Sequence, residues 1–323
     1  MANLKKPASI VFGPVPSRRL GRSLGINNIP PKTCSYSCVY CQVGKTNNLT
    51  SERQVFYNPK EVVKEVRQKV NEVRARNEKI DYLTFVSEGE PTLDLNLSKE
   101  ICSLKKTGIP IAVITNASLL FREDVREDMQ KTDFVSLKLD AISTDSWQKI
   151  NRPHKKLTLN AVLDGICKFT ESFQGTVVSE TMLIGNIDYQ KELEKIAEFL
   201  AELKKLKKAY IAVPTRPPTE KCTKAPDEDL RISAFQAFSK KLSANKVQYL
   251  TGYEGNSFSS SGNVEVDLLS ITAVHPMREE AVRKFLAKSR GNWKLVETLL
   301  AENKLVKIEY EGNTYYNRKL AKN

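Results

Sequence analysis

The chain has 323 residues, of which 40% are hydrophobic and 28% are charged, and its formal net charge is +13. This length is enough for one large α/β domain and a small additional domain. The N-terminus lacks the apolar core of a signal peptide and no apolar run reaches membrane-spanning length, so we expect a soluble, cytoplasmic protein with no membrane partner. Six cysteines in such a chain indicate reduced thiols or metal ligands rather than disulfides.

Positive charge is concentrated at the two ends of the chain. Residues 1–60 contain nine lysines and arginines against one acid, and residues 267–323 contain eleven against seven. The long segment between them therefore contributes only +1. This asymmetry has two interpretations, a polyanionic partner such as tRNA or an ordinary solvated basic surface.

The first predicted strand, residues 23–29, leads directly into a loop with three cysteines. Cys34, Cys38 and Cys41 have the spacing C-x3-C-x2-C. Three thiolates on such a loop can bind three irons of a [4Fe–4S] cluster and leave the fourth iron open for a small molecule. A structural zinc site requires four ligands, and neither a second CxxC pair nor a histidine pair is present in the sequence.

Strand and helix then alternate along the chain. Asn58 is the predicted N-cap of the helix at 59–77, whose valines lie on one face. Such alternation predicts a parallel sheet with right-handed crossovers, and six strands are too few to close an eight-stranded barrel. The predicted strands are 23–29, 80–86, 109–115, 134–139, 176–184 and 209–213, and the predicted helices are 59–77, 95–106, 122–130, 157–170, 189–204 and 227–244.

Polar residues follow several of these strands. In open parallel sheets ligands bind at the carboxyl ends of the strands, so we expect the segments at 88–92 and 185–186 to line one cavity with Asn116, Asp140 and Pro214. Residues 136, 138 and 140 alternate along one strand and share a face, as do residues 180 and 182 on the next strand.

The C-terminal region changes character. Residues 249–266 are rich in glycine, serine and asparagine and read as a linker. A short strand at 268–272, helices at 277–289 and 293–303 and a hairpin at 305–317 follow. Helix–turn–helix followed by a hairpin predicts a winged helix, with Lys294 and Lys304 at the ends of its second helix.

The three cysteines, with Tyr40 before the last one, resemble the signature of the radical S-adenosylmethionine (radical SAM) superfamily. The segments at 13–25 and 87–92 resemble a prokaryotic subfamily related to wyosine tRNA-base synthases. The resemblance implies a partial (βα)6 barrel at residues 1–248, joined by the linker at 249–266 to a winged-helix domain at 267–323. The wyosine synthases carry further N-terminal cysteines, and none precedes Cys34 here, so we do not expect this protein to be one of them.

The resemblance also implies the chemistry. A [4Fe–4S] cluster bound by Cys34, Cys38 and Cys41 cleaves S-adenosylmethionine (SAM) reductively to a 5′-deoxyadenosyl radical, which abstracts hydrogen from a substrate. A flavodoxin- or ferredoxin-type protein supplies the electron. We expect the substrate to be tRNA or another RNA. A peptide or protein substrate docked by the winged helix, and an iron–sulfur redox regulator that binds DNA, remain alternatives.

The resemblance assigns SAM contacts to residues around the strand ends. Glu90 receives the methionine ammonium, Gly89 lets the backbone approach the ligand, and Asn116 contacts the ribose or the methionine carboxylate. Lys138 meets that carboxylate, Asp140 a ribose hydroxyl and Val213 the adenine. The complete predicted set of cofactor contacts is Tyr40, Glu88, Gly89, Glu90, Asn116, Ser136, Lys138, Asp140, Glu180, Met182 and Val213.

Three further cysteines lie outside the loop. Cys102 and Cys167 occupy helical positions that we interpret as core-facing, where they act as small apolar residues. Cys222 lies on a loop just past the sixth strand, and the sequence leaves its role open. His154, in the segment Asn151–His154, is predicted to cap a turn.

Overall fold

An eight-stranded sheet forms the centre of the computed structural model, which describes residues 10–252, 254–256, 258–260 and 262–319. Its strand order is β1-β2-β5-β6-β7-β8-β9-β10, with β1 antiparallel to β2 and every other neighbouring pair parallel. The strands are β1 (Val11–Ser17), β2 (Gly21–Ile26), β5 (Tyr82–Phe85), β6 (Ile111–Thr115), β7 (Phe134–Lys138), β8 (Thr176–Met182), β9 (Leu206–Ala212) and β10 (Val247–Leu250).

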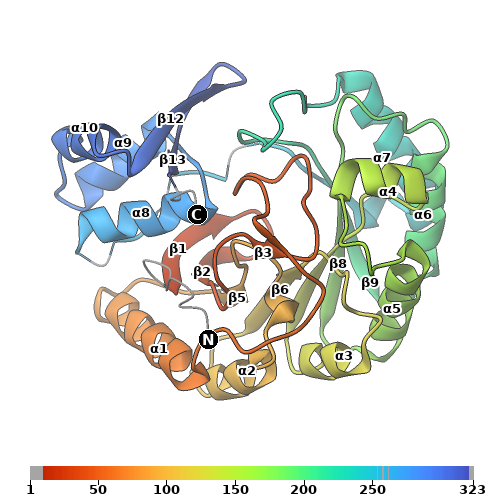
Figure 1. Cartoon of the computed structure of the whole chain (residues 1–323), viewed down its shortest axis with the longest axis horizontal. Coiled ribbons are helices and arrows are strands. Elements are labelled where there is room, and N and C mark those ends of the chain that lie inside the picture. The colour runs from red at the N-terminus through yellow and green to blue at the C-terminus, as the bar shows by residue number, and fades with distance from the viewer. Residues whose placement is uncertain (1–9, 253, 257, 261, 320–323) are drawn as a thin grey trace.

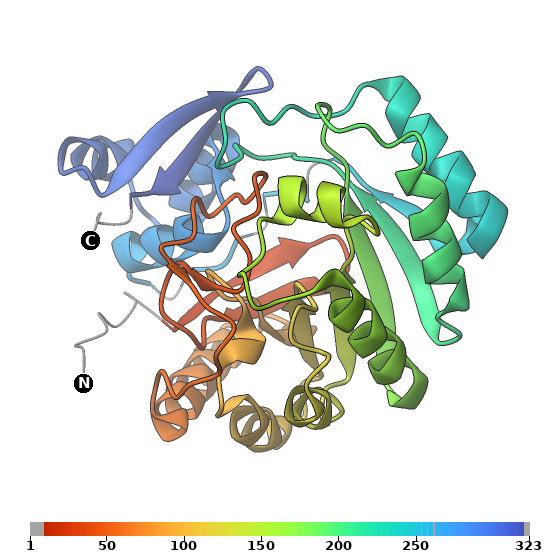
Figure 2. The same cartoon turned by 45° about the vertical axis from the view of Figure 1, so that its right-hand side comes forward.

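Helices follow the strands and cover the outside of the curved sheet, as Figure 1 and Figure 2 show. The α/β architecture predicted from the alternating pattern is therefore confirmed. The helices are α1 (Pro59–Ala75), α2 (Leu97–Lys105), α3 (Glu123–Met129), α4 (Thr144–Asn151), α5 (Leu159–Ser172), α6 (Glu192–Glu202) and α7 (Glu228–Leu242), with 3-10 turns η1 (Pro91–Leu93) and η2 (Ala244–Lys246).

Capping explains where α1 begins. The side chain of Asn58 accepts a hydrogen bond from the backbone N–H of Lys60 at 3.0 Å, as predicted. The shared apolar face of α1 is buried against the sheet and consists of Val62, Val63, Val66, Val70 and Val73.

Two strands of the central sheet, β1 and β10, and the helix α4 were not predicted from the sequence. β1 contains Gly13, Pro14 and Pro16, residues that weaken a strand pattern and are tolerated on an edge strand such as this one. β10 has only four residues, of which the first two follow the predicted helix at 227–244 without an assignment and the last two fall in the predicted linker. Helix α4, eight residues capped by Ser143, was not predicted, and only its last residue, Asn151, fell in the predicted polar loop.

The two faces of the sheet contact different cores. Val135 and Leu137 of β7 belong to the large core between sheet and helices, whereas Phe134 belongs to a small cluster on the concave face. Leu20, from the turn between β1 and β2, inserts into this concave cluster. We call the space on the concave face the lumen. The other buried members of its apolar cluster are Ala112, Val178, Tyr210, Ala212 and Leu250.

The C-terminal region packs against β1. Phe12 and Val15 of β1 share a core with three residues of helix α8, namely Leu268, Ile271 and Val274. Figure 1 shows the C-terminal elements beside β1. These elements are α8 (Val264–Val274), β11 (Met277–Arg278), α9 (Glu279–Lys288), α10 (Trp293–Ala301), β12 (Leu305–Tyr310) and β13 (Asn313–Arg318), with a sheet of order β11-β13-β12.

The strand predicted at 268–272 is wrong, because these residues lie in α8. The side chain of Asn263 caps this helix by accepting from the N–H of Val266 at 3.2 Å, and most of its sides are buried, so its apolar run mimics a strand. The predicted linker at 249–266 also contains the end of β10 and the start of α8, and its residues 253, 257 and 261 lie outside the described residues. The two helices and hairpin follow the expected order, while the winged-helix assignment stays a prediction.

In the described part of the chain, no helix is both long and apolar enough to cross a bilayer.

A buried carboxyl on α2 gives a stability prediction. Neither oxygen of Glu100 has a hydrogen-bond partner among the described residues, and burial beside Asp94 raises the pKa of Glu100 well above its usual value. We expect Glu100→Leu to increase the free energy of unfolding by about 1–3 kcal/mol, because it removes an unsatisfied buried polar group. Urea unfolding at pH 5 and pH 8 measures this.

The pH dependence has a definite sign. Above the unfolded pKa of about 4.3, the unfolded chain releases the Glu100 proton while the folded chain retains it. The wild-type free energy of unfolding should therefore fall as pH rises from about 4.3 toward the folded pKa, and Glu100→Leu should gain most at pH 8. Glu127→Leu, at an exposed position of α3, is the control. A Glu100→Leu protein less stable than wild type would contradict the prediction.

Candidate functional site

The cysteine loop lies over the carboxyl ends of the central strands and is held there by backbone hydrogen bonds. The N–H of Lys32 donates to the carbonyl of Glu88 at 2.9 Å, and the N–H of Glu90 donates to the carbonyl of Thr33 at 3.2 Å. On the other side, the N–H of Val39 donates to the carbonyl of Ile150 at 3.0 Å. The short strands β3 (Thr33–Cys34) and β4 (Asn48–Leu49) pair within this segment.

The three loop cysteines are partly buried, and carboxyl groups lie near two of them. Burial raises the pKa of Cys34 well above its usual value, with Glu90 and the other loop cysteines adding to the effect. Burial and Asp140 raise the pKa of Cys38 to about 12. Burial and the neighbouring carboxyl groups disfavour the thiolate form of Cys34 and Cys38 unless a cation compensates its charge. The donor set therefore fits a group of positively charged irons.

Side-chain amides approach two of these sulfurs. Asn116 Nδ2 lies 3.6 Å from Cys34 Sγ, and Asn151 Nδ2 lies 3.5 Å from Cys38 Sγ. Among the described residues, no three His, Cys, Asp or Glu side chains converge on a point that could hold a single metal ion. A cubane makes no such demand, since each thiolate binds a different iron.

Gly89 is required by the approach of two loops. A Cβ on Gly89 would lie 1.8 Å from the carbonyl oxygen of Thr33. No side chain fits there unless the cysteine loop moves. We predicted that Gly89 gives a ligand access to the backbone, whereas the close approach that the structure contains is to Thr33.

Glu90 and Glu88, which were both predicted to contact SAM, differ in their hydrogen bonding. Both oxygens of Glu90 accept hydrogen bonds, from Thr115 Oγ1 and the N–H of Asn116 at 2.7 Å each and from Thr92. Glu88 accepts from Asn27 Nδ2 at 3.1 Å, and its buried Oε2 has no partner among the described residues. Burial raises the pKa of Glu88 to about 7. Glu90 thus links the ends of β5 and β6, whereas Glu88 has one buried oxygen without a partner among the residues that the structure describes.

Asp140 connects the cysteine loop to the sheet. It accepts hydrogen bonds from the hydroxyl of Tyr40, from Asn151 Nδ2 at 2.7 Å and from the N–H of Met182 at 2.9 Å. Tyr40 is buried and its hydroxyl is occupied by this contact. The side chains of Tyr40 and Asp140 therefore contact each other, whereas the sequence analysis predicted that each of them contacts SAM.

Lys138 and Glu180 face each other across β7 and β8. Lys138 Nζ lies 2.7 Å from Glu180 Oε1 and 5.0 Å from the centroid of the Tyr40 ring. Arg19 also pairs with Glu180 and donates to Ser136 Oγ at 3.1 Å. The predicted side chains are thus brought together, but Lys138 is engaged by a carboxylate of the chain.

Arg19 was missed as a site residue. Its signal was the pair Arg18-Arg19 between β1 and β2, in a segment that the sequence analysis used for the family resemblance and the charge count but not for the site. Because β1 was not predicted, nothing in the sequence indicated that this turn enters the lumen.

The remaining predictions have mixed outcomes. Val213 is buried just past β9, and the backbone of His154 accepts from the N–H of Leu157 at 2.9 Å, which fits the predicted turn. Cys167 packs at the edge of the main core. Cys102 is exposed on α2, so its assignment as a core residue is wrong: Leu97, Ile101 and Leu104 form the buried face. Cys222 is exposed.

Comparisons with known proteins agree with this geometry. A family model described as the radical SAM superfamily matches residues 28–200. The chain is 49% identical over 309 residues to a UPF0026 protein of Methanocaldococcus jannaschii, covering 95% of both chains.

Two solved structures share the fold at low identity. A structure of TYW1 with a lysine–pyruvate adduct has a TM-score of 0.51 and 15% identity, covering 68% of this chain and 73% of that one. Streptococcus suis SuiB bound to the precursor peptide SuiA has a TM-score of 0.53 and 14% identity, covering 71% of this chain and 49% of SuiB.

Proposed function

This chain belongs to the radical SAM superfamily, whose enzymes use a [4Fe–4S] cluster and SAM, and we propose that it uses these cofactors to modify a tRNA or another RNA. When bound, the reduced cluster supplies the electron that cleaves SAM to a 5′-deoxyadenosyl radical, which removes a hydrogen atom from the substrate. The reaction needs a reductant, for which we propose a flavodoxin- or ferredoxin-type protein.

In this proposal the chain positions both cofactors. Cys34, Cys38 and Cys41 each bind one iron. Glu88, rather than Glu90, accepts from the methionine ammonium, because of these two glutamates only Glu88 has a carboxylate oxygen, Oε2, with no partner among the described residues. Asn116 remains a proposed SAM contact, as do Ser136, Lys138, Glu180, Met182 and Val213 around the lumen.

The observation that carries the RNA proposal is a basic groove between α1 and α2, with a volume of about 740 Å³. Its described lining contains five cations and no acid. Clustered cations without carboxylates in the lining favour a polyanion whose phosphates replace released counterions. The cations are Lys60, Lys64, Arg67, Lys99 and Lys106.

Binding to tRNA should therefore depend steeply on salt. If the five groove cations contact phosphates, the affinity should fall by about 10²-fold between 50 and 200 mM salt. Fluorescence anisotropy with labelled tRNA measures this. Lys60→Gln with Lys64→Gln should reduce the slope of the salt dependence by about 2.

The matched control changes two lysines elsewhere. Lys149→Gln with Lys168→Gln removes exposed charges that pair with Asp145 and Asp164 on their own helices, and should leave the slope unchanged. Absence of any tRNA binding at 50 mM salt would count against an RNA substrate.

A peptide or protein substrate is the second candidate. It is supported by the neutralised end of α10, where Lys304 pairs with Glu265 at 3.0 Å and with Glu302 at 2.8 Å. This pairing reduces the predicted basic character of the second helix of the C-terminal region. Stimulation of SAM cleavage by one peptide in a cellular pool, and not by tRNA, would favour this candidate. Membership in an enzyme superfamily disfavours the DNA-binding regulator.

A further inference from the structure

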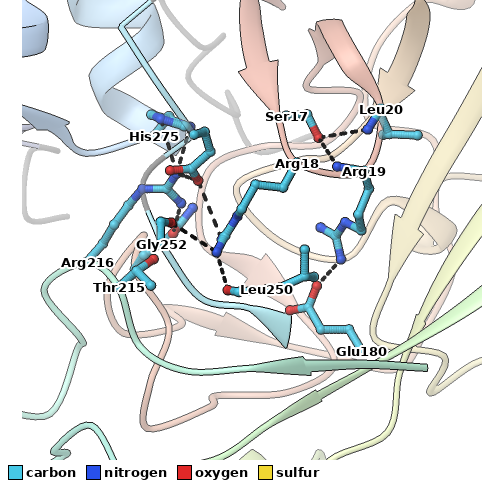
Figure 3. Close-up of polar contacts among 12 residues, drawn as sticks. Ser17, Arg18, Arg19, Leu20, Glu180, Thr215, Arg216, Leu250, Gly252 and His275 are labelled. Carbon is cyan, nitrogen blue, oxygen red and sulfur yellow. Dashed lines mark hydrogen bonds and ion pairs between the residues drawn. The ribbon is translucent and has the colours of Figure 1, made fainter. Parts of the chain in front are cut away.

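A cavity of about 130 Å³ lies at the lumen, between the β1–β2 turn, the loop after β9, the end of β10 and the end of α8. Its lining includes three arginines, Arg18, Arg19 and Arg216, which come from segments about 200 residues apart in the chain. Figure 3 shows Arg216 beside His275 with Arg18 close to them, and Arg19 directed toward Glu180. We call this the arginine cavity.

Arg18 and Arg216 share one carboxylate. Arg18 Nη2 lies 3.5 Å from Glu254 Oε1, and Arg216 Nη2 pairs with the same oxygen. Arg216 also donates to Gln42 Oε1 at 2.7 Å, and its Nη2 lies 3.1 Å from His275 Nε2. Burial and the neighbouring Arg216 hold the pKa of His275 well below its usual value, so the imidazole is neutral and adds no charge. Two cations here face one anion.

Arg19 and Lys138 form a second arrangement of the same kind. Both pair with Glu180, whose side chain is only 8% exposed. Burial, together with repulsion from Arg18, lowers the pKa of Arg19 to about 10, which still leaves it charged at neutral pH. In the described contacts, the Arg19 guanidinium donates through Nη1 alone, to Ser136 and Glu180.

The two arrangements leave positive charge uncompensated in a partly buried space. The three arginines of the lining pair with two carboxylates, Glu254 in the lining and Glu180 just outside it, and Glu180 is shared with Lys138. Confining like charges without counterions is unfavourable at low dielectric, and guanidinium groups bind oxyanions through paired hydrogen bonds. We propose that the arginine cavity binds a small oxyanionic group, a carboxylate or a phosphate, that belongs to the hydrogen-donating substrate.

The size and place of the cavity define which part of a substrate it takes. Its volume is comparable to that of a cavity that holds one benzene ring, so it admits a single small group and no folded macromolecule. Gln42, which follows Cys41 directly, lines it, and Arg19 contacts Ser136 beneath the cysteine loop. An anion held there would fix a neighbouring carbon near the proposed site of radical formation. This role rests on the proposed radical function, whereas the binding of an anion does not.

The C-terminal region completes the cavity. The hydroxyls of Tyr310 and Tyr315 donate to the carbonyls of Pro214 and Thr215, at 3.1 and 2.9 Å, and so hold the loop that carries Arg216. Gln42 Nε2 donates to the carbonyl of Val274 at 2.8 Å, at the end of α8. The inward face of the C-terminal region therefore shapes the anion site, independently of what its outer face contacts.

Isothermal titration of the full-length, cluster-reconstituted protein tests the proposal, with sodium acetate and sodium phosphate as separate probes at low ionic strength. We expect saturable binding of one equivalent of at least one probe. Preference for acetate identifies the carboxylate of an organic acid, and preference for phosphate identifies a nucleotide phosphate. Arg19→Gln and Arg216→Gln should each weaken binding at least about tenfold, the loss typical of a charge-assisted hydrogen bond.

Arg22→Gln is the matched control. Arg22 lies in the same segment, pairs with Glu78 and is absent from the cavity lining, so its replacement should leave anion affinity unchanged. Equal affinities in wild type, Arg19→Gln and Arg216→Gln, or the absence of saturable binding of both probes, would overturn the proposal. Neither result depends on tRNA. The salt-dependence assay tests the RNA proposal separately, so the two proposals can fail independently.

A second measurement needs no variant. Phenylglyoxal modifies accessible arginines, and Arg18, with a side chain 25% exposed, is reachable. Acetate or phosphate at saturating concentration should protect Arg18 and Arg216 at least about tenfold, relative to the unliganded protein, while Arg22 is modified equally. Equal modification of all three with and without the anion would overturn the proposal even if the arginine variants fail to fold.

Discussion

Replacement of Cys38 by alanine is expected to abolish reductive cleavage of SAM and to prevent assembly of a complete cluster. Three cysteine sulfurs bind three of the four irons and leave one iron open. The sequence has no fourth cysteine in the loop to substitute for a lost ligand. Loss of a direct ligand should exceed the roughly 10- to 100-fold effect typical of outer-shell partners of a metal. Anaerobic reconstitution, iron analysis and release of 5′-deoxyadenosine with dithionite measure it.

The chain offers a matched control for this experiment. Cys102 is an exposed cysteine on α2, outside the cysteine loop, and Cys102→Ala should keep full iron content and full SAM cleavage. Cys34→Ala and Cys41→Ala should behave as Cys38→Ala does. A Cys38→Ala protein that retains wild-type cleavage would show that the proposed ligand set is incorrect.

Local signals in the sequence predicted the centre of the molecule well. The cysteine spacing defines the loop, and the apolar runs that precede Glu88 and Asn116 define two of the strands that meet below it. Such features depend on residues close together in the chain, and the periodicity of side chains reports them directly. The six predicted strands accordingly correspond to β2 and β5–β9.

What the sequence could not provide is the pairing of groups far apart in the chain. Glu90 appeared free for a ligand because its partner Thr115 lies 25 positions away. Arg19 pairs with Glu180 across 161 positions, and Arg216 meets His275 only because α8 packs against β1. Each contact follows from topology, and β1 and α8 were the elements that prolines and an all-round apolar helix concealed.

The Asp140 carboxylate links the position of the cysteine loop to the position of the sheet. It binds Tyr40, Asn151 and Met182, and Asn151 in turn approaches the Cys38 sulfur at 3.5 Å. We expect Asp140→Ala to lower the rate of SAM cleavage by about 100-fold, because a displacement of about 1 Å is enough for such a loss. Iron content should remain near wild type, since all three cysteines are present.

The comparison between Asp140→Ala and Asp140→Asn identifies the cause. Asparagine keeps the size of the side chain and one acceptor oxygen for Met182, but its amide opposes the amide of Asn151, so an intermediate rate is expected. Asp145→Asn, exposed on α4, is the control and should cleave SAM at the wild-type rate. If Asp140→Ala cleaved SAM as fast as wild type while binding the same iron, the loop would be positioned by its backbone hydrogen bonds alone. Asp140 would then have no part in holding the cysteines over the sheet.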